Sequence, residues 1–138
     1  GADSLADATF NTAIALDKTN ADAWYGYASF LDSRKRYTEM LLAWRNIIEI
    51  PSVPLASKIS IVESITSKRD FYRKNFLLIE PIITRLYQLH PQDVKVIDTY
   101  IVHLIAANKI EQALVLLKQR IPYLSPGVVW LVHSYYCW

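Results

Sequence analysis

The chain has 138 residues, of which 52% are hydrophobic and 20% charged, so we expect one well-filled core and little disorder. Only three glycines occur, which favours helices joined by short connections over a fold rich in turns. The formal net charge of +2 is too small to predict a nucleic-acid-binding face, and the one basic run, at 34–36, falls where a turn is expected.

The sequence offers little sign of membrane insertion or disulfide bonding. Cys137 is the single cysteine, so an intrachain disulfide is excluded, and a lone cysteine fits a reducing or an oxidising compartment. No apolar run approaches the roughly 18 residues of a membrane-spanning helix. The first four residues lack the charged and apolar regions of a signal peptide. We therefore expect no transmembrane segment.

Apolar side chains in the first third of the chain recur every three or four positions, as in amphipathic helices. The pattern predicts helices over 4–18, 21–33 and 37–50. Ser4 and Asn20 are expected to cap the first two helices, and Pro51 to end the third. Ala28 is a small residue at the centre of an apolar face, so a neighbouring helix is expected to approach closely there.

The remaining chain continues the pattern with one irregular stretch. Helices are predicted over 56–67, 70–90, 94–107, 109–120 and 128–138. Asp70 is expected to cap the long helix, and Pro81 inside it predicts either a kink or a break into two helices. Asp93 is expected to cap the helix over 94–107.

Similar residues recur at a fixed distance along the chain. Phe10 and Trp44 stand 34 positions apart, as do Ile14 and Ile48, and this offset is the period of tetratricopeptide repeats. The spacing of Trp24, Tyr27, Ala28 and Leu31, and then of Trp44, Ile47 and Pro51, resembles the two-helix signature of that family. Met40 stands where the family prefers alanine, and Ala28 where it often has glycine.

The resemblance implies an all-α fold: a right-handed α-α superhelix, or solenoid, of about seven antiparallel helices. The expected single array consists of a second helix of a partial repeat (4–18), a repeat (21–51), an irregular longer repeat (54–91), a repeat (93–121) and a first helix of a partial repeat (126–138). Both ends would leave a helix face uncovered, so we expect the array to be cut from a longer one or to dock on another chain.

An enzymatic interpretation finds little support in the sequence. It contains no GxGxxG, P-loop, HExxH or CxxC motif, and its three histidines, His90, His103 and His133, are not spaced as a ligand set. We therefore expect no catalytic residues, cofactor or metal. Trp24 and Trp44 are assigned to helix packing, whereas Tyr25 would lean toward the inner surface.

The resemblance further implies a concave groove that binds a peptide or a partner helix. First-helix residues outside the packing stripe would line it: Asp22, Tyr25, Ser29, Asp32, Lys95, Asp98, Val102 and Ile105. This mixture lacks the basic clamp that some family members use for a terminal carboxylate. The expected function is thus a non-enzymatic protein-interaction scaffold, with no nucleic-acid partner.

Two alternatives remain open at this stage. The chain could be a purely structural segment that self-associates, as a homo-oligomer through its uncovered C-terminal helix, or it could be a helical carbohydrate-binding or hydrolase domain with a deep pocket and convergent carboxylates. The run over 51–76, followed by a long helix, also resembles bacterial cell-envelope tetratricopeptide proteins, which would imply a periplasmic location.

Overall fold

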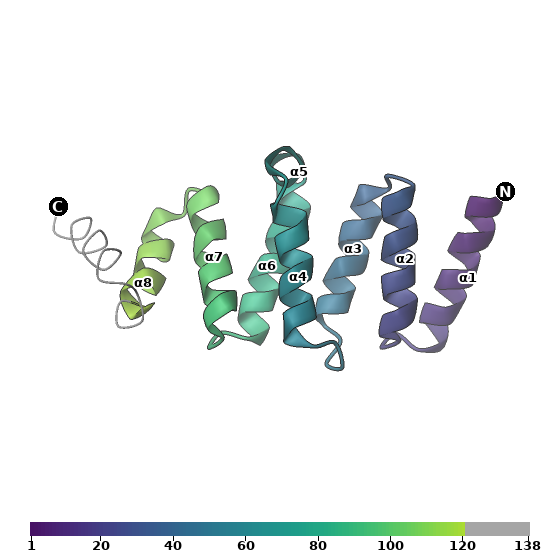
Figure 1. The fold of residues 1–138 in the computed structure, drawn as a ribbon, viewed down its shortest axis with the longest axis horizontal. Helices are drawn as coiled ribbons and strands as arrows, with labels where there is room; N and C mark the ends of the chain where they lie inside the picture. The colour runs from purple at the N-terminus through teal and green to yellow at the C-terminus, as the bar shows by residue number, and fades with distance from the viewer. Residues whose placement is uncertain (121–138) are drawn as a thin grey trace. The chain divides into compact units, whose positions relative to one another are not determined.

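A computed structural model describes residues 1–120, and every regular element in that range is an α-helix (Figure 1). The elements are α1 (Ala2–Leu16), α2 (Ala21–Ser33), α3 (Tyr37–Ile48), α4 (Leu55–Thr66), α5 (Arg69–Lys74), α6 (Phe76–Leu89), α7 (Val94–Ala106) and α8 (Ile110–Arg120). The all-α class is confirmed for this part of the chain. The helix predicted over 126–138 lies outside the described residues.

The helices belong to two compact units, each with its own core. The first unit, residues 1–89, contains α1 to α6, and the second begins at His90 and contains α7 and α8. In the second unit a buried cluster joins α7 to α8. It consists of Ile101, Leu104 and Ala113.

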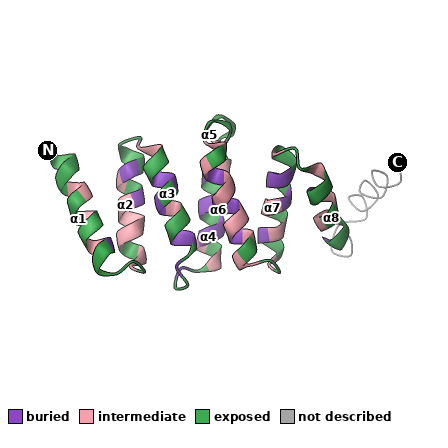
Figure 2. Cartoon of the chain, turned by 180° about the vertical axis from the view of Figure 1, so that it is seen from behind, coloured by how far each residue is buried: buried purple, intermediate pink, exposed green. Residues whose placement is uncertain are grey.

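The core of the first unit is built around α3. This helix packs against α2 on one side and against α6 on another, and its apolar side chains Leu41, Ile47 and Ile48 are almost fully buried. On α2, Ala28 and Leu31 are completely buried, as the apolar stripe predicts. Figure 2 shows buried positions on α2, α3, α4, α6 and α7. The partly buried rings of Trp24 and Trp44 pack against a neighbouring apolar cluster, so neither tryptophan is left to water.

Two helices begin at the caps that the sequence predicts. The side-chain oxygen of Asn20 accepts a hydrogen bond from the backbone N–H of Ala23 at 3.1 Å, at the start of α2. At the start of α7, Asp93 accepts from the backbone N–H of Val96 at 3.0 Å. Each oxygen pairs with one of the N–H groups that a helix start leaves without an internal partner. The two caps stand 73 positions apart.

The same two helices also end alike, and at the same offset. After α2, Lys35 has a φ of 57°, and the N–H of Arg36 donates to the carbonyl of Leu31 at 2.9 Å. After α7, Asn108 has a φ of 60°, and the N–H of Lys109 donates to the carbonyl of Leu104 at 2.8 Å. Both are left-handed helix caps of the Schellman type. The hairpins α2–α3 and α7–α8 therefore share their local geometry.

The predicted start of α1 is wrong. The helix begins at Ala2, directly after Gly1, and no side-chain hydrogen bond caps it. Ser4 lies inside the first turn, where a hydroxyl can no longer act as an N-cap because its own backbone is already helical.

The long helix predicted over 70–90 is two helices, and the break is at Asn75. Asp70 does not cap this segment, because it lies within the first turn of α5. Asn75 leaves the helical conformation, with φ −108° and ψ 21°, and its side-chain amide donates to the carbonyl of Phe71. Its own carbonyl then accepts from the N–H groups of Leu78 and Ile79, which starts α6.

Pro81, where the kink or break was expected, lies inside α6. A proline removes the hydrogen bond to the carbonyl four residues earlier, here that of Leu77. Leu77 is highly exposed, so the lost hydrogen bond falls on the side of α6 that faces solvent. The helix therefore continues through the proline.

Ion pairs and an aromatic cluster attach α1 to the α2–α3 hairpin. The guanidinium of Arg36 contacts Asp7 at 2.8 Å and Glu39 at 2.6 Å, and Arg34 contacts Asp3 at 2.9 Å. These contacts link the two acidic residues of α1 to the turn that joins α2 to α3.

The ring of Phe10 lies between Tyr27 and Phe30 of α2, with centroid distances of 5.5 and 5.9 Å. Gly26 permits this approach, because a Cβ atom at that position would lie 2.9 Å from the ring. A glycine at the contact thus allows α1 to sit close to α2.

Replacing Lys35 by glycine should stabilise the protein. A left-handed conformation costs an ordinary L-residue about 1–2 kcal/mol, and glycine avoids most of that cost although it gains freedom in the unfolded chain. We expect Lys35→Gly to raise the free energy of unfolding by about 1 kcal/mol, measured by guanidinium denaturation. Asn108→Gly is the matched control and should gain less, because asparagine tolerates this conformation. A loss of stability in Lys35→Gly would contradict the proposed cap.

The Asp7–Arg36 pair should make the protein sensitive to acid. The hydrogen bond from Arg36 lowers the pKa of Asp7 below its usual value. A carboxylate with a lowered folded-state pKa stabilises the protein above its unfolded pKa, and this contribution disappears as the pH falls through the folded value.

Asp7→Asn should therefore have a lower Tm than wild type above about pH 5, and the difference should shrink progressively as the pH falls below about 4, the unfolded-state pKa of aspartate. Thermal unfolding followed by circular dichroism across this range tests it. Parallel Tm profiles of the two proteins would show that the pair contributes nothing.

Candidate functional site

The eight residues predicted to bind a partner form two stripes, one on α2 and one on α7. In each stripe the positions are spaced by three, four and three residues, which places them on one face of a helix. The stripes belong to different compact units: Asp22, Tyr25, Ser29 and Asp32 lie on α2 of the first unit, and Lys95, Asp98, Val102 and Ile105 on α7 of the second.

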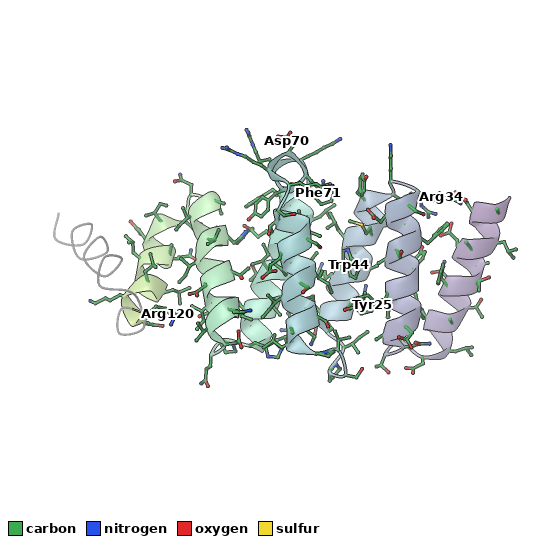
Figure 3. The ribbon with its side chains drawn as sticks, viewed as in Figure 1. Tyr25, Arg34, Trp44, Asp70, Phe71 and Arg120 are labelled. Atoms are coloured by element: carbon green, nitrogen blue, oxygen red, sulfur yellow. The ribbon has the colours of Figure 1, made fainter. Side chains whose placement is uncertain are left out.

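The α2 stripe is polar and acidic, and its one aromatic residue is partly committed to packing. Asp22, Ser29 and Asp32 are exposed. Tyr25 is half-buried, and the edge of its ring meets Trp44 with a centroid distance of 5.5 Å and an interplanar angle of 72° (Figure 3). Tyr25 therefore contributes to packing against Trp44 and the cluster around Ile47, while part of its side chain stays exposed.

The α7 stripe is exposed and combines two charged residues with two apolar ones. Val102 is 67% exposed and Ile105 is 49% exposed, and Val94, one turn before Asp98 on the same face, is 51% exposed. The opposite face of α7 is buried through Val96, Ile101, His103 and Leu104. Scattered exposed apolar residues are common on proteins, but Val102 and Ile105 are neighbours on one helix face, and Asp98 separates this pair from Val94.

An ion pair that the sequence analysis missed borders this stripe. The guanidinium of Arg120, at the end of α8, donates to both carboxylate oxygens of Asp98, at 3.1 and 3.3 Å. The Arg120 side chain is only 9% exposed, whereas that of Asp98 is 52% exposed. The charge of Asp98 is therefore already matched within the protein. Lys95, one turn away, is exposed and is the positively charged residue of the stripe.

A pocket of about 410 Å³ adjoins the first turn of α7. Its lining consists of Pro91, Gln92, Val94, Ile97, Gln119 and Arg120. This volume is within the range of small-ligand and side-chain pockets. None of the lining residues carries a carboxylate, so the pocket gives no support to a hydrolase that would need two convergent acids.

A second charged cluster, in the first unit, has a structural explanation. Lys58 on α4 is buried, and its burial lowers the pKa of the ammonium group, an effect that the nearby Glu49 opposes. Glu49 accepts two hydrogen bonds from Arg85, which lower the pKa of that carboxyl. Because the carboxylate is held by Arg85 of α6, the cluster joins α6 to the end of α3.

The remaining predicted features are consistent with packing or fall outside the described range. His103 is buried in α7 beside Tyr100. Over residues 1–120, no group of three or more His, Cys, Asp or Glu side chains is arranged to hold a metal ion. Within the same stretch no helix combines the length and apolar character needed to cross a membrane. Cys137 and His133 lie outside the described residues.

Comparisons with family models, with curated proteins and with solved structures found no match.

Proposed function

We propose that this protein is a non-enzymatic interaction scaffold of the tetratricopeptide type, whose helix pairs stack into a right-handed superhelix. The support is the repetition of structure along the chain. The hairpins α2–α3 and α7–α8 begin with the same side-chain cap and end with the same left-handed cap, 73 positions apart. Two periods of 34 plus five residues give this offset, and the extra residues fall in the irregular middle pair, which contains α5.

The observation that carries the binding function is the exposed apolar stripe of α7. Val94, Val102 and Ile105 are each about half exposed or more, on a helix whose opposite face is well buried. Covering such a surface removes apolar area from water, which contributes roughly 25 cal/mol per Å². A partner that lies along α7 is therefore stabilised without any rearrangement of the core beneath it.

The chemistry of the stripe favours one kind of partner. An amphipathic peptide helix can lay its apolar face on Val102 and Ile105, in the manner of helix-in-groove recognition. An acidic side chain on that peptide would pair with the exposed ammonium of Lys95. At the other end of the stripe, the pocket beside Val94 can receive one apolar side chain of the peptide, since Val94 and Ile97 form part of its wall.

The α2 stripe would extend the same recognition if the repeats stack as proposed. In a superhelix of this type the first helices of successive pairs line one groove. Asp22, Ser29 and Asp32 would then present an acidic, polar surface that favours basic or hydroxyl-bearing residues in a second part of the partner. The partner would thus be apolar and acidic at α7, and basic at α2.

Selection from a displayed library of amphipathic helical peptides tests this function. Peptides that bind the wild-type chain should carry an apolar stripe with an adjacent acidic residue. Their affinity should fall by about tenfold or more in Val102→Asp, because the new carboxylate would be buried against the apolar face of the peptide, and tenfold corresponds to about 1.4 kcal/mol.

The matched control is Val115→Asp on α8, which places the same change at a comparably exposed valine outside the stripe. The selected peptides should bind this control like wild type. Failure to select any peptide, or equal binding by Val102→Asp and wild type, would overturn the proposed function.

A further inference from the structure

Helix α1 carries a second apolar surface, on the side turned away from α2. Leu5, Thr9, Thr12 and Leu16 are all exposed, and their spacing of four, three and four residues aligns them along one face. Ile14 and Phe10 point the other way, into the contact with α2. Helix α1 lies at the edge of the first unit and is mostly exposed (Figures 1 and 2), so this face is accessible.

A partner could displace water from this face of α1 without leaving the threonine hydroxyls unpaired. The hydroxyl of Thr9 donates to the carbonyl of Leu5 at 2.8 Å, and that of Thr12 donates to the carbonyl of Ala8 at 2.7 Å. Both threonines therefore have their hydroxyls satisfied within α1, and a partner would meet largely apolar atoms. The helix has only two charged residues, Asp3 and Asp7, and both are paired with arginines of the α2–α3 turn.

The order of residues along this face reads the same in both directions: Leu, Thr, Thr, Leu at intervals of four, three and four. When two copies of α1 lie antiparallel, Leu5 of one chain therefore opposes Leu16 of the other, and Thr9 opposes Thr12. The spacing alternates between three and four residues, as in the seam of a two-helix coiled coil. A surface that matches itself in this way suits a contact between identical subunits related by a two-fold axis.

We propose that this face mediates a weak homodimer in which the α1 helices of two chains pack antiparallel. The contact would be small, because one helix of 15 residues offers less than the roughly 800 Å² per partner of a standard interface. The dissociation constant should accordingly be on the order of 100 μM. This dimer is independent of peptide binding at α7 and uses residues of the first unit only.

Sedimentation equilibrium of the complete 138-residue chain, from about 10 μM to about 1 mM, tests the dimer. The average mass of wild type should rise from 15.9 kDa toward twice that value. Leu16→Glu should remain monomeric over the same range, with a dissociation constant raised at least about tenfold by two charges placed in the seam. Leu77→Glu is the matched control, because Leu77 on α6 is 85% exposed and Leu16 is 84% exposed, and it should behave like wild type.

Disulfide cross-linking tests the antiparallel register. In a Cys137→Ser background, chains with Leu5→Cys and chains with Leu16→Cys are oxidised separately and as a mixture. Antiparallel packing predicts a covalent dimer only in the mixture, because position 5 faces position 16. Dimers of the single variants would overturn the register. A monomer at every concentration, or association that survives Leu16→Glu, would overturn the α1 contact.

Discussion

The close packing of α2 against α3 is the contact on which the rest of the first unit depends. Ala28 and Leu31 of α2 and Ile47 and Ile48 of α3 are completely buried, and no larger residue could replace Ala28 without separating the helices. The left-handed cap at Lys35 reverses the chain within a few residues, which brings the two helices together. Once α2 and α3 are packed together, another face of α3 contacts α6. Arg34 and Arg36, in the turn between the two helices, form ion pairs with the acidic residues of α1.

The sequence predicts this hairpin well because its signals are local. The cap at Asn20, the apolar stripe through Ala28 and Leu31 and the end of α2 near Ser33 each depend on residues within a few positions of one another. The same local signals predict α7, including its cap at Asp93. The N-caps predicted at Ser4 and Asp70 are wrong because serine and aspartate also suit the first turn of a helix. In both cases the helix begins a little before the predicted cap.

The break between α5 and α6 could not be located from the sequence. Pro81 is the stronger helix breaker in isolation, yet its missing hydrogen bond falls in a turn that solvent can reach. Asn75 ends α5 because its side chain bonds back to Phe71 and its carbonyl starts α6. The ring of Phe71, edge-on to Tyr37 at 5.3 Å, then ties α5 to α3 (Figure 3). Such contacts join residues that are distant in the sequence, which helical periodicity does not reveal.

The candidate binding surfaces likewise depend on contacts that helical periodicity does not reveal. Helical spacing predicts which residues share a face of α7, and Val102 and Ile105 are both exposed on that helix. Periodicity could not predict that Arg120 pairs with Asp98, since the two residues stand on different helices. The packing of Tyr25 on Trp44 is a similar case. The side chains of each stripe that could contact a partner can therefore be identified only when the ion pairs and ring contacts are known.

The stability of Ala28→Trp tests most directly whether the α2–α3 contact organises the first unit. The added indole has no space at a completely buried position, so the free energy of unfolding should fall by about 1–3 kcal/mol. Ser29→Trp places the same residue on the adjacent, exposed position and should change it by less than about 0.5 kcal/mol. Unchanged stability in Ala28→Trp, measured by guanidinium denaturation, would contradict the close approach of the two helices.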